Sequence, residues 1–216
     1  MDQAIWQQVQ QAAAEMSPLE VIAVGFALVY VVLAAMENIW CWLAAFISAS
    51  IYTYICYTSN LKAEAGLQLF YVVMAVVGYM QWRRKNNSTS LQAHTKVEEV
   101  RQISSLGLKK NILIIGINIA LTFVLGYILK NYLDSANPYV DAFTTIFSLY
   151  TTYMVTQKVL ENWLYWVVID AVSIWLYSSR GLYLSALLFG LYTVLAVVGF
   201  FQWFRLYKKE KEAVAA

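Results

Sequence analysis

Residues 71–82 read YVVMAVVGYMQW, and residues 192–203 repeat this stretch as YTVLAVVGFFQW. A second pair of similar stretches lies upstream in the same order, ENIWCW at 37–42 and ENWLYW at 161–166. Two matches that keep one order and a similar spacing indicate an internal duplication. The sequence therefore predicts a fold built from two copies of one structural unit.

The upstream pair sets the register between the two copies. When the shared Glu-Asn is superposed, Trp42 corresponds to Trp166 and Asn38 to Asn162. The interval from that tryptophan to the tryptophan ending the downstream stretch is then 40 residues in the first copy and 37 in the second. We expect the difference to fall in the loop between the paired helices.

Composition places this duplication in a membrane. The chain of 216 residues is 61% hydrophobic and 13% charged, whereas soluble domains carry about 25% charged residues. Bilayer is the solvent that fits, and only helices pair all their backbone groups within a single spanning segment. We expect an all-α integral membrane protein with seven transmembrane helices, at about 19–36, 39–57, 65–83, 111–132, 139–158, 162–179 and 182–204.

Three spans make one copy, and the fourth span links the copies. Because three is odd, the extra crossing starts the second copy on the same side as the first, which gives parallel repeats in a 3+1+3 arrangement. Pro18 and Pro138 precede the first and fifth spans, at helix starts where proline is tolerated. The expected segments are an extracellular N-terminal segment 1–18, a first repeat 19–84, a cytoplasmic loop 85–110, a linker helix 111–133, a second repeat 138–205 and a cytoplasmic tail 206–216.

Basic residues predict the orientation. Of the two sides that seven spans define, one carries twelve lysines and arginines and the other carries only Lys62, Lys130 and Arg180. The positive-inside rule makes the richer side cytoplasmic, so the N-terminus is expected outside and the C-terminus inside a bacterial inner membrane. The net charge of +2 is explained by these residues and requires no nucleic-acid partner.

The N-terminal residues and the longest loop allow two further predictions. Residues 1–17 lack a basic start followed by an apolar core, so no cleavable signal is expected. Residues 90–106 have the pattern of a short amphipathic helix on the cytoplasmic surface. His94 lies in that segment without a second ligand nearby, and we interpret it as a surface histidine.

Polar groups inside membrane spans are costly, so each is a candidate for function. Asp170 lies about 12 Å into the sixth span at 1.5 Å per residue, close to the midplane. It belongs to a stripe on one helix face, with Trp163 at its edge, that comprises Asn162, Trp166, Asp170 and Ser173. The alternative interpretation is that Asp170 pairs with a neighbouring helix for assembly.

The third and fifth spans add polar candidates. Gln68 and Tyr71 share a face of the third span, and Tyr192 repeats that face in the seventh. Thr144 and Ser148 belong to a polar stripe on the fifth span. Helix–helix hydrogen bonding, typically worth only ~0.6 kcal/mol in membranes, explains these polar groups equally well.

Two pairs of residues on these helices have a structural interpretation. Gly78 and Gly199 are expected to permit close helix packing. Trp82 and Trp203 stand at the cytoplasmic ends of their spans, where tryptophan usually anchors a helix at the lipid headgroups.

The chemistry of the spans favours a carrier over an enzyme. No nucleophile–base pair, metal-spaced His/Cys cluster or phosphate-binding glycine loop is evident, so we expect no catalysis, no cofactor and no metal. Lysine and arginine are absent from the span interiors, so a phosphorylated solute would lack a counter-charge. A neutral or cationic aromatic solute suits the tryptophan faces, at about 0.5–2 kcal/mol for each cation–π contact.

The stretches at 37–42 and 67–82, ENWLYWVVIDAVSIWLY at 161–177 and the final run at 181–203 resemble the PnuC-type nicotinamide riboside transporters over about residues 20–205. The resemblance implies a helical fold related to the SWEET sugar transporters, facilitated diffusion of nicotinamide riboside, trapping by a cytoplasmic riboside kinase and a homotrimer. The chain departs from the family at Leu43, Ala44 and Ala45, where members often have proline or glycine, and it lacks the Pro-Gln motif of SWEET proteins.

By similarity, the central cavity of this family falls on the sixth and third spans, with Asn38 and Trp42 as first-repeat counterparts. The expected substrate-binding residues are Trp163, Trp166, Asp170, Gln68, Tyr71, Asn162, Asn38, Trp42, Thr144, Ser148 and Tyr192. The pyridinium ring is expected to stack on Trp163 or Trp166. The alternatives are a carrier of another vitamin-like aromatic such as thiamine, or a membrane subunit that does not itself transport.

Overall fold

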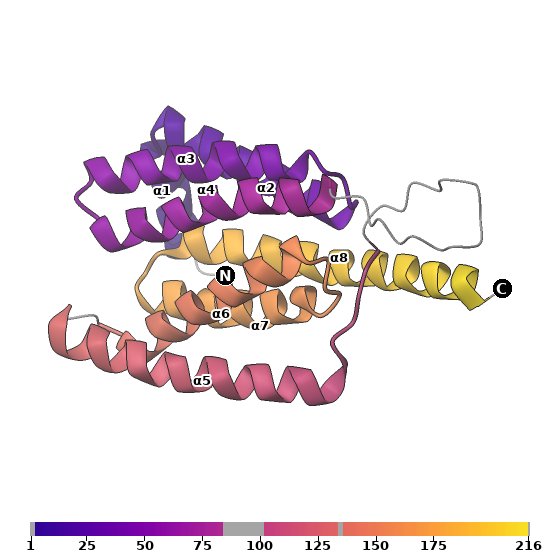
Figure 1. Ribbon diagram of the computed structural model, residues 1–216. Coiled ribbons are helices and arrows are strands. Elements are labelled where there is room, and N and C mark those ends of the chain that lie inside the picture. The colour runs from indigo at the N-terminus through magenta and orange to yellow at the C-terminus, as the bar shows by residue number, and fades with distance from the viewer. Residues whose placement is uncertain (1–2, 84–101, 134–135, 216) are drawn as a thin grey trace.

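The computed structural model describes residues 3–83, 102–133 and 136–215 (Figure 1). These residues form eight helices and no strand, which confirms the all-helical prediction. The helices are α1 (Gln3–Glu15), α2 (Pro18–Ala35), α3 (Cys41–Thr58), α4 (Lys62–Arg83), α5 (Gly107–Tyr132), α6 (Pro138–Thr156), α7 (Asn162–Ser179) and α8 (Tyr183–Ala215).

Helices α2 to α7 begin and end close to the expected spans, and two features differ from prediction. Helix α1 lies in the segment expected to precede the first span, and α8 continues from the expected end at residue 204 to Ala215. At 1.5 Å per residue, α8 is about 50 Å long and exceeds the hydrocarbon thickness. Residues 102–106 are not helical, so the predicted amphipathic helix does not include them; its other residues, with His94, lie outside the described part.

The surface of the helices is that of a membrane protein. Five helices, α2, α3, α4, α5 and α8, are long and apolar enough to cross a bilayer. Helices α6 and α7 have 19 and 18 residues and are not among these five. Large apolar side chains are exposed along α5, including Ile112, Leu113 and Phe123. Such surfaces are stable against lipid and costly against water.

Both prolines begin helices, as predicted. Pro18 follows the N-cap residue Ser17, whose hydroxyl accepts from the Glu20 amide while the Glu20 carboxylate accepts from the Ser17 amide. This capping box satisfies two backbone donors that the helix start leaves without partners. Pro138 occupies the first turn of α6.

The helices pack as two groups of three, and α5 packs beside the second group. Helices α2, α3 and α4 pack together, α6, α7 and α8 pack together, and α5 packs against α6 along the lower edge of Figure 1. The groups meet where α2 contacts α8 and α4 contacts α6. The first helix of each group thus contacts the third helix of the other, as expected for two units related by a two-fold axis.

Equivalent positions in the two groups differ by 121 residues. Glu37 and Lys158 both have positive φ, 58° and 51°, in the turns before α3 and α7. Asn60 and Gly181 have φ of 61° and 72° in the turns at the other ends of these helices. Asparagine and glycine are the residues that adopt this left-handed conformation most easily, so the two turns use different side chains for the same geometry.

This register corrects the one inferred from the upstream stretches. Trp42 packs on Gly78 in the first group, and Trp163 packs on Gly199 in the second. The counterpart of Trp42 is therefore Trp163, not Trp166, and the interval to the next tryptophan is the same in both groups. Asn38 correspondingly matches Val159. The Asn38 N–H donates to the Leu33 carbonyl, and the Val159 N–H donates to the Met154 carbonyl, which is the equivalent position.

Candidate functional site

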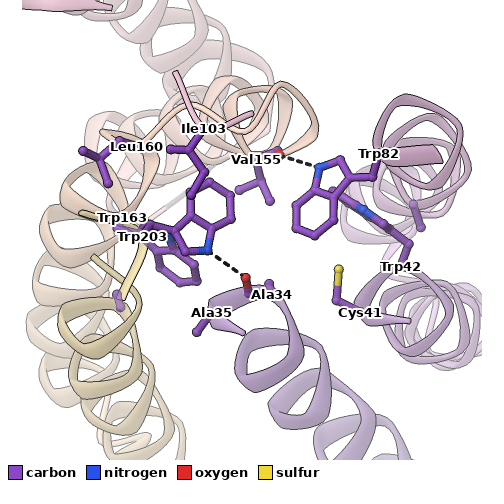
Figure 2. Close-up of a cluster of buried hydrophobic side chains, with 12 residues drawn as sticks. Ala34, Ala35, Cys41, Trp42, Trp82, Ile103, Val155, Leu160, Trp163 and Trp203 are labelled. Carbon is purple, nitrogen blue, oxygen red and sulfur yellow. Dashed lines mark hydrogen bonds between the residues drawn. The ribbon is translucent and has the colours of Figure 1, made fainter. Parts of the chain in front are cut away.

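Four tryptophans meet between the two groups of helices (Figure 2). Trp42 and Trp82 contact edge-to-face at 5.4 Å and 87°, and Trp163 and Trp203 do the same at 5.5 Å and 86°. Trp82 and Trp203 join the pairs, with ring centroids 6.0 Å apart. We call these four residues the tryptophan cluster. Its near-equal halves are a further sign of a two-fold relationship.

The cluster is held by reciprocal hydrogen bonds. Trp82 Nε1 donates to the Val155 carbonyl at 3.1 Å, and Trp203 Nε1 donates to the Ala34 carbonyl at 3.0 Å. Both rings are buried, with Trp203 fully inaccessible. The prediction that Trp82 and Trp203 anchor the helices at the headgroups is therefore wrong, because their rings turn inward to the opposite group.

An ion pair lies beside the cluster. Lys158 Nζ contacts Glu37 Oε1, and the two residues occupy equivalent turns, 121 positions apart. The Lys158 side chain is 2% exposed, and its Nζ also lies 4.8 Å from the centroid of the Trp82 ring. Burial of a lysine is costly unless a carboxylate compensates its charge, so Glu37 is essential to this geometry.

Residues 102–106, which precede α5, cover the end of the bundle that holds the tryptophan cluster. The backbone at Ser104 pairs with the turn before α7: its N–H donates to the Lys158 carbonyl, and its carbonyl accepts from Leu160. The Ile103 side chain is 4% exposed and inserts into the hydrophobic core that contains the tryptophan cluster (Figure 2). The Ile103 N–H donates to Glu210 of α8 at 3.1 Å. The segment is therefore tied to both α7 and α8.

Asp170 is buried halfway along α7, at 3% exposure. Within the described residues no lysine or arginine pairs with it; the two salt bridges join Glu37 to Lys158 and Asp141 to Arg180. A carboxylate in such a position favours a cationic partner, because the low-dielectric surroundings leave its charge unscreened.

A tyrosine of the second group lies near this carboxylate, and other buried tyrosines lie near one another. Tyr192 of α8 lies close enough to Asp170 for an electrostatic interaction, and Tyr52 of α3 lies close to Tyr192. Tyr71 of α4 lies near Tyr30 of α2. Tyr30 and Tyr52 are not among the expected site residues, because a tyrosine in an apolar run carries no sign of the direction in which it points.

The two tryptophans expected to stack on a ligand lie in different surroundings. Trp163 is 3% exposed, packs against Gly199 and Trp203, and has an indole N–H without a partner among the described residues. Trp166 is half-buried at the edge of the same core and stands one helical turn from Asp170. Its ring is therefore the more accessible of the two.

One side-chain contact joins the third and fifth expected spans. Tyr71 and Ser148 lie within side-chain hydrogen-bonding reach of each other, which joins α4 to α6. Ser148 is 8% exposed and Gln68 is half-buried. Tyr71 and Ser148 therefore lie where α4 faces α6.

Other expected site residues make local bonds. The Asn162 amide donates to the Val159 carbonyl at 2.6 Å, while its buried Oδ1 has no partner among the described residues. Asn38 Oδ1 accepts from the Trp40 N–H at 3.0 Å within its own turn. Thr144 donates to carbonyls of its own helix. Asn38 and Thr144 thus have structural partners that account for their polarity.

The fold and the buried polar groups define a multi-helix membrane protein with an internal duplication and a buried carboxylate on α7. Residues 17–205 match the family described as nicotinamide mononucleotide transporter, and the chain belongs to that family. This match covers both groups of helices and α5.

Individual relatives agree with this assignment. The chain is 27% identical to the nicotinamide riboside transporter PnuC of Neisseria mucosa, over 78% of this chain and 65% of that protein. It is 22% identical to PnuC of Escherichia coli K12, over 88% and 86%. The fold is similar to the crystal structure of the vitamin B3 transporter PnuC, with a TM-score of 0.70 and 25% identity, covering 95% of this chain and 90% of that one.

One relative has a different solute in its name. The riboflavin/roseoflavin transporter RibM of Streptomyces davaonensis is 23% identical over 87% of this chain and 84% of its own length. Proteins similar to this chain therefore differ in their aromatic solutes, and the solute must be argued from the site.

Proposed function

We propose that this protein transports nicotinamide riboside across a bacterial inner membrane. The single observation that carries the proposal is the buried Asp170, which lacks a basic partner among the described residues. Tyr192 lies near it, and Trp166 stands one helical turn away on α7. Nicotinamide riboside carries a permanent positive charge on an aromatic ring, so a carboxylate and aromatic faces complement it. The named activity of the PnuC relatives supports the same solute.

The charge of the site favours the riboside over the mononucleotide that gives the family its description. A mononucleotide adds a phosphate, which Asp170 would repel. Lys158 and Arg180, the basic residues on either side of α7, are already paired with Glu37 and Asp141. We infer that the pyridinium ring stacks on Trp166, which itself packs against the core that contains Trp163. We also infer that Gln68 and Asn162 offer hydrogen bonds to the carboxamide or the ribose.

The mode of transport we propose is uniport by alternating access. Seven spans in a 3+1+3 arrangement are supported by the equivalence of α2–α4 with α6–α8, since helices related by duplication cross the membrane alike. The basic C-terminal end of α8 is then cytoplasmic. Solute entering down its gradient would be trapped by phosphorylation in the cytoplasm, and a homotrimer is the expected assembly.

Uptake into proteoliposomes that contain only this protein tests the proposal. Radiolabelled nicotinamide riboside should accumulate to equilibrium without an ion gradient, and Asp170→Asn should slow uptake at low substrate concentration. The matched control is Asp141→Asn, which removes a carboxylate in the first turn of α6 that pairs with Arg180 at the end of α7. Equal uptake by empty liposomes and by the wild-type protein would overturn the proposal.

A second candidate is a neutral aromatic vitamin, favoured by the similarity to the riboflavin/roseoflavin transporter. Thiamine, which is itself a cation, remains a further alternative. A panel of the three vitamins in the same liposomes separates them. Riboflavin uptake that is unaffected by Asp170→Asn would identify a neutral solute and remove the charge argument.

A further inference from the structure

The polar contacts of the tryptophan cluster cross from one group of helices to the other at a single end of the bundle. Trp82 bonds to the end of α6, Trp203 bonds to the end of α2, and the turns after those two helices meet through Glu37 and Lys158. In Figure 2, the indole rings of both groups lie side by side around the dashed bonds to Val155 and Ala34. This end is closed by bonds between the units, not within them.

The ion pair has a special place in this arrangement. Residues at equivalent positions of two-fold related units contact each other only near the axis. Glu37 and Lys158 are equivalent and in contact, so they lie near the axis of the duplication. A duplicated position would carry the same residue twice, and two like charges there would repel; here the two copies carry opposite charges that attract.

A rocking motion that separates the units at this end must break these contacts together. Both tryptophan bonds and the ion pair cross the same interface, and Ile103 is wedged into its core. We infer that Glu37, Lys158, Trp82 and Trp203 form the inner gate of the carrier, which opens when the Glu37–Lys158 pair separates. This inference rests on the proposed transport function and on a cytoplasmic location for this end.

The chain contains its own reporter of gate opening. Cys41 is 0% exposed and lies in the same core as Trp42 and Trp82, near Lys158 (Figure 2). The other cysteine, Cys56, is partly exposed near the opposite end of α3. In a Cys56→Ser background, a membrane-impermeant maleimide applied to inverted membrane vesicles reaches Cys41 only when the gate opens.

The test is the rate of Cys41 labelling in four variants of that background. Glu37→Gln leaves Lys158 buried without its counter-charge, so labelling should accelerate about tenfold or more. The double variant Glu37→Lys with Lys158→Glu restores attraction between equivalent positions and should return labelling to the background rate. Trp203→Phe removes one bond across the interface and keeps a ring, so labelling should accelerate less. Asp141→Asn breaks an ion pair inside one unit and should change nothing.

Two results would overturn the gate. One is unchanged labelling in both Glu37→Gln and Trp203→Phe; the second variant covers the case in which the first does not fold. The other is equal acceleration in Glu37→Gln and Asp141→Asn, which would indicate general loosening. Labelling needs no solute, whereas failure of the wild-type protein to bind nicotinamide riboside would refute the proposed function alone.

Discussion

Trp82 and Trp203 stand at equivalent positions of the two helix groups, and each donates its indole N–H to the helix end of the opposite group. Their acceptors, Val155 and Ala34, are equivalent to each other in the same register. Such an exchange requires two units that face one another across a two-fold axis. The two copies of the duplicated unit are therefore joined by a pair of equivalent hydrogen bonds.

Equivalent bonds should have equal strength. Trp82→Phe and Trp203→Phe each remove one donor to a carbonyl, and each should lower the free energy of unfolding by about 1 kcal/mol. Thermal unfolding in detergent measures both. If the two variants lose several-fold different free energies of unfolding, the two hydrogen bonds have equivalent geometry but unequal strength.

The glycines under the indole rings should tolerate no side chain. A Cβ at Gly199 would lie 2.7 Å from Trp163 Cε3, and a Cβ at Gly78 would overlap the Trp42 ring. Gly199→Ala should destabilise the protein by about 1–3 kcal/mol, because two helices must move apart. Gly190→Ala on the same helix is the control, since nothing lies within 4 Å of its Cβ position. Equal unfolding temperatures for the two variants would refute the packing argument.

Trp166 and Trp163 should differ in their effects. Trp166→Ala should weaken nicotinamide riboside binding about tenfold through loss of a desolvated cation–π contact, and should change stability little. Trp163→Ala should mainly lower stability, by about 3–5 kcal/mol for an aromatic ring lost from a packed core. Calorimetric titration and thermal unfolding of both variants separate the roles; retained binding in the double variant would exclude stacking.

Asp170 should distinguish charged from neutral ligands. Asp170→Asn keeps the size of the side chain and removes its charge, so affinity for the cationic riboside should fall at least about tenfold. Affinity for neutral nicotinamide should stay nearly constant. An equal loss for both ligands would assign Asp170 a structural role.

Much of the helical pattern could be predicted, because an apolar run of about 20 residues leaves few choices in a bilayer. Helices α2 to α7 begin and end close to the expected residues. Helix α1 was missed, since its polar composition gives no hydrophobic signal. The end of α8 was placed too early, because hydropathy marks where a helix leaves the membrane and not where it stops.

The site was harder to predict than the helices. Matching letters aligned Glu37 with Glu161, whereas the turns align Glu37 with Lys158, which carries the opposite charge. The sequence could not show that Trp82 and Trp203 point inward, because a tryptophan at the end of a span can contact either lipid headgroups or another helix. The burial of Asp170 could be predicted, because a carboxylate within an apolar run has few structural explanations.

The most direct measurement is a calorimetric titration of purified wild-type protein with nicotinamide riboside and with its 5′-phosphate. The buried Asp170 carboxylate, with Tyr192 near it, predicts that the riboside binds and that the phosphate binds at least about tenfold more weakly. Tighter binding of the phosphate would contradict the account, because Asp170 would then face a ligand of its own charge.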